Sequence, residues 1–270
     1  MNRKRYSDKT TVASLVALVV LVLIGWSWFG ASAAPQDDAR TPTPTASFTT
    51  QAPTTPLEPT TPSDVHTLTA ADVLALLPVK GRAPKTDYSR EQFGQRWSDV
   101  DRNGCDQRND VLNRDLTSIT HKDGTRSCVV VTGTLESDPF TGTRIDFVRG
   151  EKTSQAVQID HVVALSDAWQ KGAQQLTEEQ RLFFANDPLN LLAVDGPTNH
   201  SKSDGDAASW LPPHKAFRCT YVATQVAVKH KYDLWVTQAE HDAIARVLES
   251  CPDEPLPQDS GLDVPPADAD

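Results

Sequence analysis

An acidic residue directly precedes a histidine at Asp160 and His161, within the apolar run 157–165. A neutral imidazole can take a proton from water, and a carboxylate beside it can hold Mg²⁺ or a similar ion. Neighbouring residues of a regular strand point to opposite faces, so both side chains can serve one site only where the strand ends. We therefore predict a strand that ends at this pair, with a general base beside one metal ligand.

A second segment, residues 190–204, supplies another candidate ligand. It contains a short apolar strand, a turn with Gly196 and Pro197, and then Asn199. Glycine as the cap and proline at the first position favour a helix start, which leaves Asn199 in the first turn with its side-chain oxygen free for a hard cation. Asn190, at the start of the strand, is expected to hydrogen-bond backbone and to brace the acid–histidine loop.

Each of these residues also has a purely structural interpretation. His161 alone could be a core histidine bound to a backbone carbonyl, Asp160 a capping acid, and Asn199 an asparagine that caps a helix start. Lys202 and Arg108 are candidate phosphate contacts, although a solvated lysine explains the first at least as well and an ordinary ion pair explains the second better. The combination of acid, base and amide favours the catalytic interpretation.

A separate acidic stretch fits the first half of a D-x-D-x-N-G calcium loop. The matching residues are Asp99, Asp101, Asn103 and Gly104, and Asp110 falls at the twelfth position. A cysteine stands at the seventh position, and the flanks do not read as clean EF-hand helices. A Ca²⁺ site is therefore one interpretation, and a polar turn held by the cysteine is the other.

The first 34 residues have the pattern of an export signal. Basic residues at positions 3–5 precede an apolar run over 12–29 and an Ala-x-Ala-like cleavage site. That run is also close to the ~20 residues that cross a bilayer, so a cleaved signal peptide and a signal anchor both remain open. In either case the rest of the chain is expected outside the cytoplasm, secreted or held on the outer face of the membrane by this segment alone.

Composition divides the remaining chain into three parts. Residues 35–63 are rich in threonine and proline and are expected to form a disordered linker. Residues 252–270 carry six acids and no base and are expected to form a disordered tail. The folded domain is predicted over residues 64–251, and a monomer is expected.

All four cysteines lie within that domain, at Cys105, Cys128, Cys219 and Cys251. An even number outside the cytoplasm favours two disulfides. Three pairings are possible, and closing the shortest loops favours Cys105–Cys128 with Cys219–Cys251. A structural zinc site is disfavoured because no C-x-x-C pair occurs.

Hydrophobic periodicity predicts an α+β domain in which helices and short strands alternate. Helices are expected over 70–77, 89–97, 106–116, 166–173, 177–185 and 238–248, and a hairpin of strands over 128–135 and 143–148. Residues 221–232 fit either a helix or a strand.

These motifs resemble a known family. The series Asp160-His161-Val162-Val163-Ala164, Asn190, and Asn199 with Lys202-Ser203-Asp204 is similar to the ββα-metal (HNH, His-Me finger) motif of HNH endonucleases. Further segments resemble the secreted actinobacterial DUF1524 type, which is related to the C-terminal part of GmrSD restriction enzymes: 97–105, 138–142, 168–169, 186–191 and 210–213.

The resemblance implies His161 as the general base and Asn190 as the bracing residue of the catalytic motif. It implies Asp160 and Asn199 as metal ligands. Relatives often have histidine at the third motif position, so His200 beside Asn199 is an alternative ligand. An asparagine oxygen favours Mg²⁺ (or Mn²⁺) over zinc.

The charge of the chain argues against a typical nucleic-acid binder, because the formal net charge is −10 and the pI is about 5.1. The acidic tail accounts for part of this excess, and a metal ion supplies local positive charge. We therefore expect an extracytoplasmic, metal-dependent endonuclease that hydrolyses phosphodiester bonds of nucleic acid, with DNA as the expected substrate. The alternative is a non-catalytic extracellular module, tethered to the envelope and stabilised by calcium.

Overall fold

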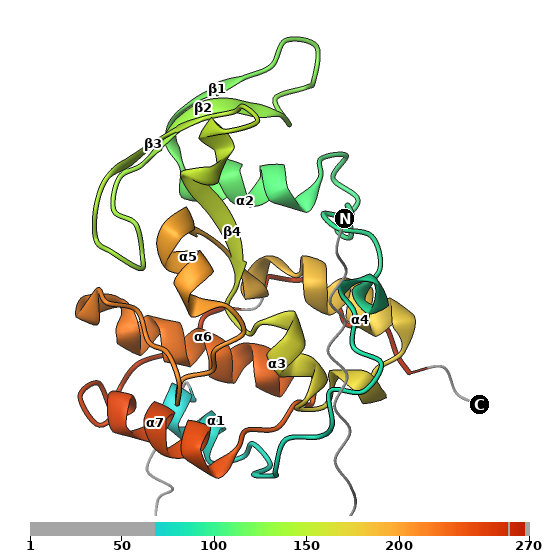
Figure 1. Ribbon diagram of the computed structural model, residues 1–270, viewed down its shortest axis with the longest axis vertical. Coiled ribbons are helices and arrows are strands. Elements are labelled where there is room, and N and C mark those ends of the chain that lie inside the picture. The colour runs from blue at the N-terminus through green and yellow to red at the C-terminus, as the bar shows by residue number, and fades with distance from the viewer. Residues whose placement is uncertain (1–67, 259, 268–270) are drawn as a thin grey trace, which may run out of the picture. The chain divides into compact units, whose positions relative to one another are not determined.

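The computed structural model describes residues 68–258 and 260–267 (Figure 1). The expected export signal and the linker over 35–63 lie outside the described residues. Within the part that is described, no helix is long and apolar enough to cross a membrane. Helices and two small antiparallel sheets alternate along the chain, which confirms the α+β class.

The strands form two separate antiparallel sheets. Strands β1 (Thr117–His121), β2 (Val130–Leu135) and β3 (Ile145–Val148) form the first sheet in that order. Strands β4 (Val157–His161) and β5 (Leu191–Asp195) form the second. The expected hairpin is β2–β3, and β4 ends at the acid–histidine pair as predicted. The sequence does not predict β1, because its Thr-Ser-Ile-Thr-His run has one apolar residue and no alternating apolar face.

The α-helices are α1 (Ala70–Leu74), α2 (Gln107–Asp115), α3 (Leu165–Trp169), α4 (Glu178–Asn186), α5 (Gly196–Lys202), α6 (Arg218–Lys231) and α7 (Gln238–Leu248). Short 3-10 turns lie at η1 (Arg90–Phe93), η2 (Thr153–Gln155), η3 (Ala173–Gln175), η4 (Pro188–Asn190) and η5 (Lys215–Phe217). Three helices begin with a capping box, at Thr69, Thr177 and Thr237. In each box the threonine hydroxyl accepts from a backbone N–H three residues on, and that residue's side chain bonds back, so two free donors are satisfied.

The helix expected over 89–97 is wrong over most of its length. Only η1 forms, and the Ser89 hydroxyl makes no capping hydrogen bond. Gly94 follows with a φ of 69°, and Trp97 has a φ of 58°, so the backbone leaves helical geometry twice. The segment instead runs as an irregular strip along the domain.

Helix α6 contains the ambiguous segment 221–232 and is the centre of the helical core. Its β-branched residues, such as Val226, are buried against α1 and α7. A further apolar cluster joins α2 to both sheets through Leu112, Phe147 and Leu191. In Figure 1, β4 runs from the three-stranded sheet toward α3 and α6. The apolar cluster between α2 and the two sheets therefore holds β4, the strand that carries the acid–histidine pair.

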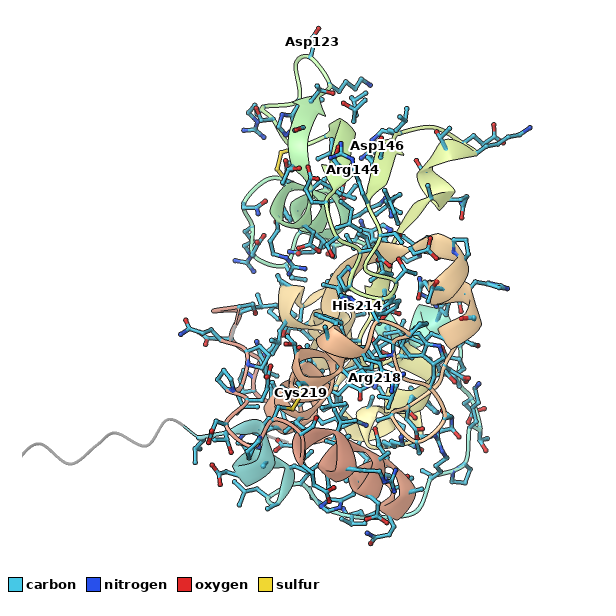
Figure 2. All side chains as sticks on the ribbon, turned by 90° about the vertical axis from the view of Figure 1, so that its left-hand side faces the viewer. Asp123, Arg144, Asp146, His214, Arg218 and Cys219 are labelled. Atoms are coloured by element: carbon cyan, nitrogen blue, oxygen red, sulfur yellow. A yellow bond between two sulfur atoms is a disulfide. The ribbon has the colours of Figure 1, made fainter. Side chains whose placement is uncertain are left out.

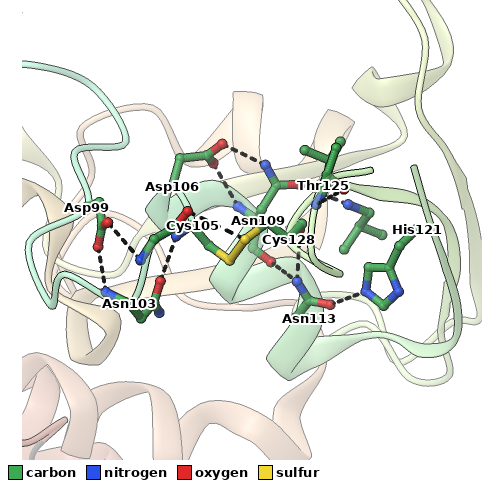
Figure 3. The surroundings of a disulfide bond; sticks show 12 residues. Asp99, Asn103, Cys105, Asp106, Asn109, Asn113, His121, Thr125 and Cys128 are labelled. Carbon is green, nitrogen blue, oxygen red and sulfur yellow. Dashed lines mark hydrogen bonds between the residues drawn. A yellow bond between two sulfur atoms is a disulfide. The ribbon is translucent and has the colours of Figure 1, made fainter. Parts of the chain in front are cut away.

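Both predicted disulfides are confirmed, as Cys105–Cys128 and Cys219–Cys251. The first ties the loop before α2 to the residues that lead into β2 (Figure 3). The second ties the start of α6, where Figure 2 labels Cys219, to the residue three positions after α7. All four sulfurs are thereby used, so the zinc interpretation does not apply.

The expected disorder of residues 252–270 stays a prediction, and the described part of this segment makes contacts with the domain. Leu262 is buried, and the Gln180 side chain donates to the Pro265 carbonyl at 2.9 Å. Apolar residues between the prolines are therefore sufficient to hold the described part of this tail against α4. An acidic, proline-rich composition does not reveal such contacts, because they depend on a surface formed by other parts of the chain.

Candidate active site

A ββα unit made of β4, β5 and α5 positions the predicted motif. His161 lies opposite Leu191 in the strand pair, and α5 packs on both strands. Helix α5 begins one residue earlier than expected: Asp195 is the cap, and its carboxylate accepts from the Thr198 backbone N–H at 2.8 Å. Gly196 is required at the first helical position, because a Cβ there would lie 1.9 Å from the Gln155 carbonyl oxygen.

The His161 imidazole is fixed by a backbone carbonyl. Its Nε2 lies 2.9 Å from the Ala185 carbonyl oxygen, in the last turn of α4. A carbonyl can only accept, so Nε2 carries the proton and Nδ1 keeps the lone pair. The Trp97 ring stacks beside the imidazole, with centroids 6.3 Å apart and planes 15° apart. The orientation of the base is thus set from both a helix end and an aromatic neighbour.

Burial lowers the pKa of His161 to about 3, although the hydrogen bond to Ala185 opposes this shift. The positive charges of Arg90, Lys202 and Arg96 lower the pKa further. The imidazole is therefore neutral at physiological pH, with a free lone pair on Nδ1, but a pKa this low makes it a weak base in the absence of substrate. An anionic phosphate in the site would raise the pKa and strengthen the base.

Asp160 is buried and only partly satisfied. Its Oδ1 lies 2.8 Å from the Lys202 ammonium, whereas its Oδ2 has no hydrogen-bond partner among the described residues. Burial raises the pKa of Asp160, and the attraction of Lys202 only partly offsets it. An unpaired buried carboxylate oxygen is costly, and such atoms often mark an ion or ligand position.

Lys202 holds this corner of the site together. Besides Asp160, its ammonium contacts the His161 carbonyl oxygen at 2.8 Å, and its side chain is buried. A phosphate contact by Lys202 remains a prediction, because the ammonium is engaged by these two partners here.

Asn199 lies in the first turns of α5 and is half-buried. Its Nδ2 donates to the Gln158 side-chain oxygen at 3.0 Å, which leaves Oδ1 as an acceptor. Both Asn199 and His200 line the same cleft as Asp160. The choice between these two as the second metal ligand therefore stays open.

Asn190 braces the loop that follows the histidine. Its side chain is fully buried, accepts from the Val163 backbone N–H at 2.8 Å, and donates to the Val163 carbonyl at 3.3 Å. Its backbone carbonyl accepts from Val162 at 2.9 Å. One asparagine thus fixes both residues after the histidine, and it does so without contacting the cleft.

A cleft with a volume of about 620 Å³ opens over these residues. One wall is formed by β4 and α5, and the other by the irregular strip of residues 85–97. That strip contributes Lys85, Arg90 and Arg96 together with two aromatic rings. Three bases and two acids, Asp160 and Asp204, line the cleft, so its lining carries a small excess of basic side chains although the chain as a whole is acidic.

Asp204 links the two walls. It accepts from Ser166 at 2.8 Å and pairs with Lys85 at 3.2 Å. The hydrogen bond from Ser166 lowers the pKa of Asp204, which keeps this carboxylate ionised and able to hold Lys85.

Arg108 lies away from this cleft, whereas Lys202 and Asn190 do not line it but contact residues of β4 and of the loop that follows this strand. The residues lining the cleft in the described chain do not include Arg108, and its side chain is half-buried on α2. Burial lowers the pKa of Arg108, and the nearby Arg149 adds to the effect. The predicted calcium residues form a separate group: Asp99, Asp101 and Asn103 lie in the loop before α2, and Asp110 lies in the first turn of that helix.

Sequence reasoning missed the opposite wall of the cleft. Trp97, Arg90, Arg96 and the side chain of Gln158 each contact or surround the predicted residues. The Trp97 motif was visible as part of the family resemblance, but nothing in its spacing indicates a contact with His161. Exposed arginines carry no local signal, because their placement depends on a loop without regular structure.

Residues 106–247 match the family of GmrSD restriction endonucleases, C-terminal domain. An uncharacterized secreted protein of Arthroderma benhamiae is 38% identical over 195 residues, which cover 72% of this chain and 90% of that protein. No solved structure matches the chain. The chain belongs to the family of the C-terminal domain of GmrSD restriction endonucleases, and its class is therefore nuclease-related.

Proposed function

We propose that this protein is an extracytoplasmic, metal-dependent endonuclease of the HNH type that hydrolyses phosphodiester bonds of nucleic acid, with DNA as the expected substrate. The observation that carries the proposal is the ββα unit, which brings a neutral His161, the unpaired oxygen of Asp160 and the amide oxygen of Asn199 to one basic cleft. The family and the secreted relative support the nuclease class and the location.

The donor set fits a hard divalent cation. Asp160 Oδ2 is buried and unpaired, and Asn199 contributes a neutral oxygen, which is the ligand chemistry of Mg²⁺ or Mn²⁺. When bound there, the ion supplies charge neutralisation at the phosphate and at the leaving oxygen. His200 would be the second ligand if imidazole replaced the amide.

The protein's own residues handle the proton and the position of the phosphate. His161 Nδ1 accepts a proton from a water molecule while the water oxygen forms a bond to phosphorus and one P–O ester bond breaks. Ala185 and Trp97 fix the orientation of the imidazole, and the mechanism requires that Nδ1 face the cleft. Arg90 and Arg96 attract the polyanion, and Lys202 keeps Asp160 and the His161 backbone in register.

The test is cleavage of supercoiled plasmid DNA by the purified protein with Mg²⁺ or Mn²⁺, with and without EDTA, beside an RNA substrate. Cleavage should need the metal and fall about 10²–10⁴-fold in His161→Ala, since general-base catalysis has that magnitude. His230→Ala, an exposed histidine on α6, is the matched control and should cleave at the parent rate. Undiminished cleavage by His161→Ala would sink the mechanism, and inactivity of the parent with every metal would favour the non-catalytic module.

A further inference from the structure

The loop before α2 is organised around acidic side chains. The two oxygens of Asp99 accept from the backbone N–H groups of Asn103 and Gly104, at 3.0 and 2.9 Å (Figure 3). The Asn103 amide donates to Asp101 at 3.0 Å. Hydrogen bonds of this kind define a turn, and alone they do not identify a ligand.

Gln107 provides the independent observation. Its side chain is completely buried, yet neither Oε1 nor Nε2 has a hydrogen-bond partner among the described residues. The Gln107 side chain interacts with Asp101, although no hydrogen bond of normal geometry joins the two. Asp110 Oδ2 is likewise buried and unpaired. Buried polar atoms without partners are rare in native proteins, so a group that satisfies them is expected between these side chains.

The spacing of these residues is that of a twelve-residue calcium loop. Such loops take ligands from positions 1, 3, 5, 7, 9 and 12, with a backbone carbonyl at 7 and glycine at 6 for the sharp turn. Positions 1, 3, 5, 9 and 12 here are Asp99, Asp101, Asn103, Gln107 and Asp110. Gly104 stands at position 6 with a φ of 92°, and α2 begins at position 9.

We infer that residues 99–110 bind one Ca²⁺ through the side chains of Asp99, Asp101, Asn103 and Asp110, the Cys105 carbonyl, and Gln107 directly or through water. The seventh-position cysteine is no obstacle, because a calcium loop uses only its backbone oxygen there. Its side chain is bound to Cys128, which ties the loop to β2.

The charge of the loop also favours a cation, because residues 99–110 bring the carboxylates of Asp99, Asp101 and Asp110 into one short segment. These acids are not among the described groups of three metal-binding side chains within 4.8 Å of one another. The proposed site therefore requires the side chains to move closer together when the ion binds. A flexible site with many oxygens selects Ca²⁺ over the smaller, strictly octahedral Mg²⁺.

The ion would also order one wall of the cleft, a consequence that rests on the proposed function. Trp97 stacks on His161 two residues before the first ligand, and the Ser98 N–H donates to Asn186 at 3.0 Å. Calcium would therefore act on the position of Trp97 and Arg96 without entering the reaction.

The primary experiment measures binding and does not depend on nuclease activity. The metal-stripped protein is titrated with CaCl₂ in a calorimeter, and its thermal midpoint is followed with Ca²⁺ or Mg²⁺. We expect one Ca²⁺ site, in the range of about 10⁻⁴ M or tighter, and a higher midpoint with Ca²⁺ than with equal Mg²⁺. The absence of calorimetric binding and of any midpoint shift at millimolar Ca²⁺ would overturn the inference even if the protein cleaves DNA.

Two variants test the ligands. Asp101→Asn, at an exposed position, should weaken Ca²⁺ binding about tenfold or more, because a charged ligand is lost. The control Asp123→Asn changes an exposed acid in the β1–β2 connection that Figure 2 labels, outside the proposed ligands, and should leave the affinity unchanged.

Gln107→Leu separates a ligand from a structural residue. Replacing an unpaired buried amide with an apolar group of similar size should keep or raise the thermal midpoint without calcium and reduce the calcium-dependent shift. A full calcium shift in both Gln107→Leu and Asp101→Asn would contradict the site.

Discussion

Two regions of the molecule bury a lysine against aspartate, and they treat the charge in opposite ways. In the helical core, Lys171 contacts Asp167, Asp206 and Glu240 at 2.6–2.8 Å. Lys229 and Arg82 complete this group, which we call the core network: it has equal numbers of acids and bases. In the candidate active site, Lys202 faces Asp160 alone.

The pKa directions of the two aspartates show the difference. Burial opposes ionisation of Asp206, but Lys171, Ser209 and Arg82 together lower its pKa to about 2. Burial outweighs Lys202 at Asp160 and raises its pKa. The core network is closed in the sense that each of its buried carboxylates lies in at least two ion pairs, whereas Asp160 Oδ2 has neither an ion pair nor a hydrogen-bond partner among the described residues.

This comparison separates charge that stabilises the fold from charge that is available for chemistry. A closed network satisfies every member and gains stability from it. An open pair retains binding capacity at the expense of stability, as expected where a metal is to be held. Substitutions in the core network should therefore lower the free energy of unfolding, whereas substitutions in the Lys202–Asp160 pair should lower metal-dependent cleavage.

The largest expected effect on stability comes from Lys171→Met. Removing this ammonium leaves three buried carboxylates without their common partner, and such losses cost about 3–5 kcal/mol. Urea unfolding followed by circular dichroism measures the change, with the exposed Lys152→Met as the control. A loss below about 1 kcal/mol would show that the network contributes little.

The paired variants Asp206→Asn and Asp160→Asn should give opposite outcomes. Asp206→Asn should lower the free energy of unfolding by about 2 kcal/mol, the equivalent of its pKa shift, and spare activity. Asp160→Asn should change stability by less than about 1 kcal/mol and reduce metal-dependent cleavage about 100-fold or more. Equal stability losses in the two variants would remove the distinction between them.

The pH dependence sharpens the same contrast. The native pKa of Asp206 lies below its unfolded value, so its stabilisation is present above about pH 4 and is lost as the pH falls toward about 2. Burial lowers the pKa of His161 to about 3 in the protein without substrate, so kcat/KM, which reports the free enzyme, should show no loss from this base between pH 6 and 7. The acid limb should instead reflect protonation of Asp160, and raising the Mn²⁺ concentration should move it to lower pH. A limb near pH 6.5 that ignores metal concentration would contradict this assignment.

The smallest effect is expected at the cleft wall. Arg90→Gln and Arg96→Gln should each raise KM for DNA and reduce the slope of log affinity against log salt by about 0.9. Both side chains are exposed, so the unfolding free energy should stay within about 0.5 kcal/mol of the parent. If the slope of log affinity against log salt concentration is unchanged in the double variant, then the nucleic acid does not bind along this wall of the cleft.

The parts of the fold that local chemistry specifies could be predicted from the sequence. Thr69, Thr177 and Thr237 cap their helices through residues three positions away, and both disulfides join neighbouring cysteines. The end of β4 at the acid–histidine pair followed from the demand that both side chains serve one site.

The parts that depend on distant partners could not be predicted. The inward turn of Lys202 requires a buried acid 42 residues earlier, and no helical periodicity reveals it. The contact of Trp97 with His161 arises from a strip without regular hydrogen bonding. The sequence therefore predicted which residues belong to the candidate site. It did not predict the cleft or the basic side chains on its opposite wall.

The tight seat of Gly196 has a practical consequence. A single added methyl group would collide with rigid main chain at Gln155, and only a tilt of the whole helix could relieve it. Gly196→Ala should therefore shift α5 relative to β4. The proposed metal ligands Asn199 and Asp160 would then lie further apart, although neither side chain is changed.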